Sequence, residues 1–164
     1  MDALWQILEP AANWLGTTAL ALWLGASTGR VAWLLIAHLT GLTMLLGTTL
    51  VLNLRLLGLL FKRHPVSELR RELYVWNLTG LGLMLFSGIL IFMGGEISYF
   101  NGDWFRIKME ILAVALIFHF TLFRKLTKAH ENQFPPLWNK ITAAVSLLLW
   151  FGVAVSGRNI AYFS

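Results

Sequence analysis

The chain has 164 residues, the length of one domain, of which 57% are hydrophobic and 13% are charged, with a net charge of +5. Soluble domains average roughly 25% charged residues, so this composition excludes a soluble protein and indicates an integral membrane protein. The absence of cysteine excludes disulfides, zinc-thiolate sites, iron–sulfur clusters held by the chain and covalently attached haem. The basic residues flank apolar runs, where they set membrane topology, so nucleic acid is not expected as a partner.

The first apolar stretch, about residues 4–26, is expected to form a helix in the membrane interface. It contains Trp5, Trp14 and Trp23, and tryptophan favours the headgroup zone of a bilayer. A short fifth membrane span is the alternative for this segment. In the interfacial interpretation, residues 25–29 form the corner that leads into the first spanning helix.

Four further stretches are predicted to cross the membrane as helices. Two are charge-free over more than 20 residues, and the other two are shorter and rely on lysine and arginine at their ends to reach the interface. The predicted spans are about residues 31–60, 72–95, 106–127 and 138–158. The expected fold is therefore all-α, a single domain over residues 1–164 that forms an integral membrane four-helix bundle with an N-terminal interfacial helix.

The distribution of basic residues predicts the orientation of this bundle. Nine lysines and arginines lie in or beside the connections between the first and second and between the third and fourth spans, against four on the other side. Because positive charge is retained in the cytoplasm, both connections are expected there and the C-terminus outside, in a bacterial cytoplasmic membrane.

Two histidines lie inside the predicted spans, His38 in the first and His119 in the third. A polar side chain in hydrocarbon is costly unless it is paired or faces a cavity, so such residues are the first candidates for a functional site. Both are candidate axial ligands of non-covalent b-type haem, because imidazole ligates haem iron and helix bundles place such ligands on facing helices. The alternatives are copper at the same histidines, or histidines that only make structural hydrogen bonds.

The depths of the two histidines argue against one haem held by both. At 1.5 Å per residue, His38 lies roughly 25 Å from Arg55 and His119 roughly 7 Å from Arg124. If both arginines mark one interface, the histidines differ in depth by about 18 Å, whereas a pair of axial ligands should be nearly level. Two sites, or one haem with a single histidine, fit better.

A second group of candidates lies at the level of His38. Glu110 and Arg158 come within a few residues of that level, and Lys108 precedes Glu110 by two positions. Arg158 or Lys108 is expected to neutralise haem propionates, and Glu110 to tune the site or relay protons. An ordinary ring of interfacial charges is the alternative.

Several short motifs resemble known membrane families. The stretch from His38 to Arg55, together with Lys108 and His119 eleven residues later, is similar to the first and third helices of the four-helix bacterial protoporphyrinogen oxidase family and to the copper-resistance D-type proteins. That resemblance implies a small inner-membrane haem b protein. The segment before Arg55 reads Leu-Asn-Leu where the oxidase pattern has Tyr-Leu-Pro. The whole chain looks closer to an uncharacterised family of small bacterial four-helix membrane proteins.

The sequence therefore predicts an integral membrane protein that binds haem b and transfers electrons between a membrane donor such as quinol and a partner protein. The protein is expected to contact membrane lipid and to form a homo-oligomer or part of a larger membrane complex. Two alternatives come from other classes: an enzyme of the porphyrinogen oxidase kind, and a cofactor-free accessory subunit.

Overall fold

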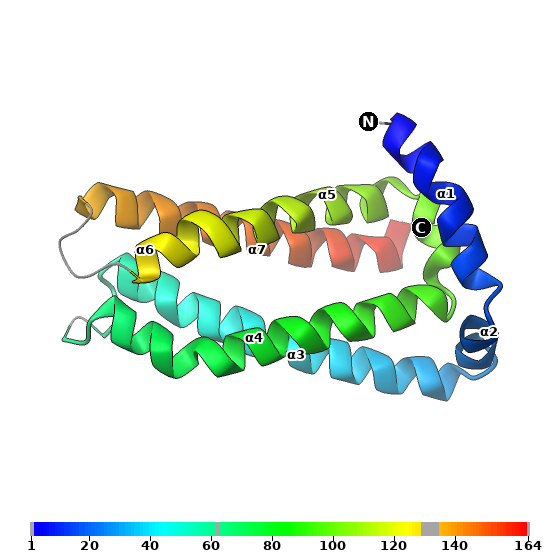
Figure 1. The fold of residues 1–164 in the computed structure, drawn as a ribbon, viewed down its shortest axis with the longest axis horizontal. Helices are drawn as coiled ribbons and strands as arrows, with labels where there is room; N and C mark the ends of the chain where they lie inside the picture. Colours follow the sequence, from blue (N-terminus) through cyan, green and yellow to red (C-terminus); the bar gives the residue numbers. More distant parts are fainter. Residues whose placement is uncertain (1, 62, 129–134, 164) are drawn as a thin grey trace.

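The computed structural model describes residues 2–61, 63–128 and 135–163, and these are almost entirely helical (Figure 1). The elements in chain order are α1 (Asp2–Gly16), α2 (Ala19–Gly25), α3 (Thr28–Leu56), α4 (Val66–Met93), a 3₁₀ segment η1 (Glu96–Asn101), α5 (Asp103–Phe118), a π-helical segment η2 (His119–Phe123), α6 (Arg124–Lys128) and α7 (Pro136–Phe163). The prediction of an all-α fold is confirmed.

The long helices form two antiparallel pairs that lie side by side. One pair is α3 with α4, and the other is α7 with the continuous run of α5, η2 and α6 (Figure 1). One end of the bundle, here called the terminal end, carries α1, α2, η1 and the end of α7. The opposite end, called the loop end, carries the connection from α3 to α4 and the end of α6. The α1 helix lies across the terminal end of the bundle (Figure 1).

The bundle buries several polar side chains within its apolar core and exposes large apolar side chains on its outside. Asn53, Thr142 and Ser146 are at most 1% exposed, whereas Trp33 and Leu148 are at least 70% exposed. Hydrocarbon surroundings favour this arrangement, because apolar side chains can face lipid and polar groups must find their partners within the protein. Within the described part of the chain, three helices rather than the predicted four are long and apolar enough to cross a membrane: Thr28–Leu56, Val66–Met93 and Pro136–Ile160.

The expected third span is the one that differs from a regular helix. Residues 103–128 run without a break, but the π-helical segment η2 divides them into α5 and α6. The expected interfacial helix over residues 4–26 is also divided, because Thr18 caps a new helix. Its side chain accepts a hydrogen bond from the amide of Ala21 at 3.3 Å.

The boundaries of α3 and α4 differ from those expected from hydropathy. The first spanning helix ends at Leu56 rather than near residue 60, because Gly58 takes a φ of 73°. The amides of Gly58 and Leu59 then bond to the carbonyls of Arg55 and Leu54, which is a Schellman termination. The second begins at Val66 rather than residue 72, since a polar first turn extends it beyond the apolar run.

The α3 and α4 helices approach each other closely at two glycines. A Cβ atom at Gly41 would lie 2.7 Å from the amide nitrogen of Met84, and one at Gly80 would lie 2.7 Å from that of Leu45. Each would also lie 2.8 Å from the other glycine's carbonyl oxygen. The two backbones are therefore in direct contact, the kind of approach that small residues permit in membrane helices.

Candidate functional site

His119 lies at the centre of a buried hydrogen-bond network that joins three helical elements. Its Nε2 is 3.1 Å from Oδ1 of Asn77, and the Asn77 amide donates to the hydroxyls of Thr48 and Thr49 at 2.9 and 3.0 Å. Because the amide oxygen can only accept, Nε2 of His119 carries the proton. The deprotonated Nδ1 is buried and has no hydrogen-bond partner among the described residues.

Aromatic rings enclose the imidazole of His119. The ring of Phe123 stacks on it at 5.3 Å between centroids, and Phe120 and Trp150 meet it edge-on at 5.4 and 6.1 Å. His119 is also the first residue of η2, and π-helical segments are frequent at functional sites. The imidazole of His119 is therefore surrounded by aromatic rings from η2 and α7.

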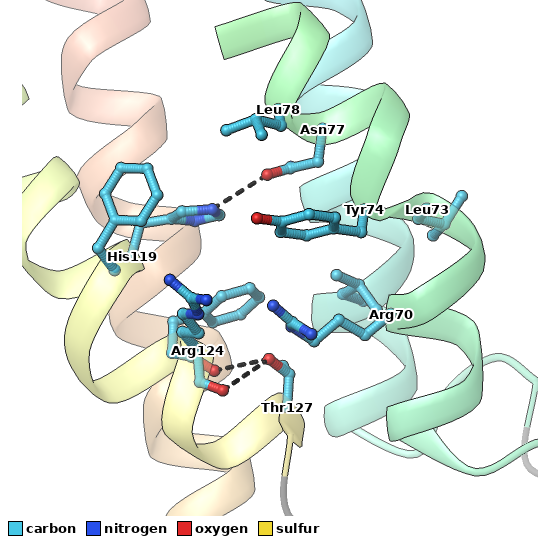
Figure 2. Close-up of a pocket in the computed structure, with 11 residues that line it drawn as sticks. Arg70, Leu73, Tyr74, Asn77, Leu78, His119, Arg124 and Thr127 are labelled. Carbon is cyan, nitrogen blue, oxygen red and sulfur yellow. Dashed lines mark hydrogen bonds between the residues drawn. The ribbon is translucent and has the colours of Figure 1, made fainter.

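A small pocket opens beside His119 at the loop end of the bundle (Figure 2). Its volume is about 30 Å³, which is room for one or two water molecules and far below the 300 Å³ or more that typical ligand pockets provide. Its lining comes from α3, α4, η2 and α6: Leu52, Arg70, Leu73, Tyr74, Asn77, Leu78, His119, Phe120, Phe123, Arg124 and Thr127.

His38 has the opposite arrangement of its two ring nitrogens. Its Nδ1 lies 2.9 Å from the carbonyl oxygen of Met84 and 3.2 Å from the hydroxyl of Ser87, both on α4. A carbonyl only accepts, so Nδ1 carries the proton and Nε2 keeps its lone pair. The ring lies against Gly88, where a Cβ atom would be 3.1 Å from Cε1 of His38.

One of the charged candidates, Lys108 on α5, lies near His38. The positive charge of Lys108 acts on His38, and the end of the Lys108 side chain packs on Gly157, 3.6 Å from the position of a Cβ atom there. Arg158 follows Gly157 directly on α7 and is exposed. Glu110 instead accepts a hydrogen bond of 3.4 Å from the indole of Trp5 on α1.

The two histidines contact different levels of α4. His119 bonds to Asn77, whereas His38 bonds to Met84 and Ser87, which are seven and ten residues further along the same helix. At 1.5 Å per residue, these partners are about 10–15 Å apart along the axis. Among the described residues, no three His, Asp or Glu side chains are placed to hold a metal ion.

The sequence interpretation missed the buried asparagines. Besides Asn77, the amide of Asn53 donates to Ser146 at 3.1 Å and links the two helix pairs, and Oδ1 of Asn53 is buried with no partner among the described residues. The sequence could have indicated them, because Asn53 and Asn77 both lie within predicted membrane spans. A side-chain amide in hydrocarbon is costly unless it is paired, as an imidazole is.

Fold and site together define an all-helical, multi-pass membrane protein with two polar centres in its interior. The chain belongs to the family described as "Family of unknown function (DUF6644)", whose sequence model matches residues 12–164. No curated protein and no solved structure matches the chain significantly.

Proposed function

We propose that this protein binds non-covalent haem b in the terminal half of the bundle, with His38 as the axial ligand, and transfers electrons. The observation that carries the proposal is the hydrogen bond from Nδ1 of His38 to the carbonyl of Met84. A bond of this kind fixes the tautomer and the ring orientation of a ligating histidine, and it leaves Nε2 as the nitrogen with a free lone pair.

The donor set around His38 fits haem b better than the set around His119. Lys108 lies close enough to act on His38 by its charge, and a cation near the ligand can neutralise a propionate. Arg158, which follows Gly157 on α7, is the second candidate. Gly88 lets the ring of His38 lie directly against α4, and Gly157 lets the end of the Lys108 side chain lie against α7. At His119, Nε2 is bonded to Asn77 and the other nitrogen, Nδ1, is buried, so we assign no ligand role to this ring.

Bound haem would supply one-electron chemistry, and the protein would supply its ligand, its counter-charges and a dry setting. A quinol in the membrane is the proposed electron donor and a redox protein the proposed acceptor. Glu110 is held by Trp5 at the terminal end, where a carboxylate can exchange protons with the interface while an electron moves.

The test of this proposal is a reduced-minus-oxidised visible spectrum of the full-length protein, produced with ample haem and purified in mild detergent. We expect the spectrum of a b-type haem at about one haem per chain. Protein that is folded and free of haem would contradict the proposal and favour the cofactor-free accessory subunit. Oxidation of protoporphyrinogen by the haem-loaded protein would favour the porphyrinogen oxidase alternative.

We also propose that the loop end faces the cytoplasm of a bacterium and that the C-terminus is periplasmic. The support is the excess of basic residues at the loop end, nine against four. A periplasm-active reporter fused after Ser164 is expected to be active, and the same reporter inserted at Pro136 inactive. The reverse pattern would invert the orientation.

A further inference from the structure

Two arginines from different helices face each other across the pocket at the loop end. Arg70 comes from α4 and Arg124 from α6, and Figure 2 shows their guanidinium groups pointing into the same space. Arg70 also lies over the ring of Tyr74, with its central carbon 5.1 Å from the centroid. The hydroxyl of Tyr74 points toward His119 across the same space. The pocket is therefore built by groups that converge from separate parts of the chain.

The lining of this pocket offers hydrogen-bond donors and positive charge without a matching anion. Among the described residues, no acidic side chain lines it. Asn77 is bonded to His119, and the hydroxyl of Thr127 donates to the carbonyl of Phe123 at 2.8 Å, whereas Nδ1 of His119 has no partner among the described residues. Two like charges held together are unfavourable unless an anion lies between them.

We propose that this pocket binds a phosphate-type oxyanion, presented by the headgroup of an anionic phospholipid or as free phosphate. Guanidinium groups bind phosphate oxygens through paired hydrogen bonds, and two guanidinium groups that face each other can hold two oxygens of one phosphate. The 30 Å³ of space admits one or two oxygen-sized groups between them while the rest of the ligand stays outside.

The surroundings of the pocket suit a lipid. Tyr74, Leu78 and Phe120 line it and are 39–44% exposed, so they lie on the outer surface of the bundle. An acyl chain can follow that apolar surface while its phosphate reaches the arginines. Basic pockets between membrane helices bind anionic headgroups in this way. The site is separate from His38, so it stands or falls independently of the haem proposal.

The test compares charge loss inside the pocket with equal charge loss beside it. The pocket variant is Arg70→Gln with Arg124→Gln, and the control is Arg71→Gln with Lys125→Gln, whose residues are sequence neighbours that do not line the pocket. Full-length protein in detergent is titrated with dioleoyl-phosphatidylglycerol and dioleoyl-phosphatidylcholine by native mass spectrometry, and with inorganic phosphate by calorimetry. Helical content is recorded for each variant.

We expect phosphatidylglycerol to bind in preference to phosphatidylcholine. Each pocket arginine should contribute about tenfold in affinity, and the control pair about twofold in total. Arg70→Lys with Arg124→Lys keeps the charge and should bind with intermediate affinity, which separates ligand loss from unfolding. Saturable inorganic phosphate binding with the same dependence on the variants would identify free phosphate as the source and supports the site. Equal loss in pocket and control variants, or equal binding of the two lipids, would overturn the proposal.

Discussion

Replacement of His38 by alanine is expected to remove haem from the protein, whereas replacement of His119 should leave most of it bound. The reason is the different state of the two rings. Nδ1 of His38 donates to Met84 and leaves Nε2 for iron, whereas Nε2 of His119 donates to Asn77 and its Nδ1 is buried. The measurement is haem per folded chain, from pyridine haemochrome absorbance and protein concentration.

Imidazole in the buffer provides the control for this pair of variants. It should restore haem to His38→Ala by replacing the missing ring, and it should not alter His119→Ala. His119→Ala is expected instead to lower the melting temperature, since it leaves the buried Oδ1 of Asn77 without its donor at a cost of roughly 1–3 kcal/mol. If His119→Ala alone empties the protein of haem, our choice of ligand is wrong.

A methyl group at Gly80 should destabilise the protein far more than one at Gly82. The Cβ atom of Gly80→Ala would lie 2.7 Å from the backbone of Leu45 and 2.8 Å from that of Gly41, so α3 and α4 must separate. Overpacking of this kind costs about 1–3 kcal/mol, and backbone atoms cannot rotate away as side chains can. The measurement is thermal unfolding in detergent followed by circular dichroism.

Gly82→Ala is the matched control, because it lies on the same helix and a Cβ atom there meets no atom within 4 Å. It should be neutral or raise stability by up to about 1 kcal/mol, since alanine favours a helix over glycine. Equal melting temperatures for the two variants would show that the contact between the helices is looser than described.

Hydropathy predicted the helices well because the cost of exposing backbone groups to lipid acts on whole segments. It could not predict their ends, which depend on local groups such as the left-handed Gly58 and the capping side chain of Thr18. The sequence also predicted that His38 and His119 lie at different depths. In the structure their partners on α4 are separated by two to three helical turns, in agreement with that prediction.

The contacts of the candidate site were harder to predict from the sequence. One amino-acid sequence does not show which face of a helix packs against which neighbouring helix. The pairing of His119 with Asn77 and of Glu110 with Trp5 could therefore not be derived. The same holds for the glycines. Gly41 touches another backbone, whereas a Cβ atom at Gly47 would meet nothing within 4 Å, and both occur in the same apolar run.

The pairing of helices also bears on how the chain is inserted into a membrane. The closest partners, α3 with α4 and α5 with α7, are neighbours in sequence, so each hairpin can assemble soon after its synthesis with little loss of chain entropy. The bonds between hairpins, His119 to Asn77 and Asn53 to Ser146, can form only when the second hairpin arrives. Until then, Oδ1 of Asn77 and the amide nitrogen of Asn53 in the first hairpin lack these partners. The cost of leaving polar groups unpaired in lipid favours association of the two hairpins.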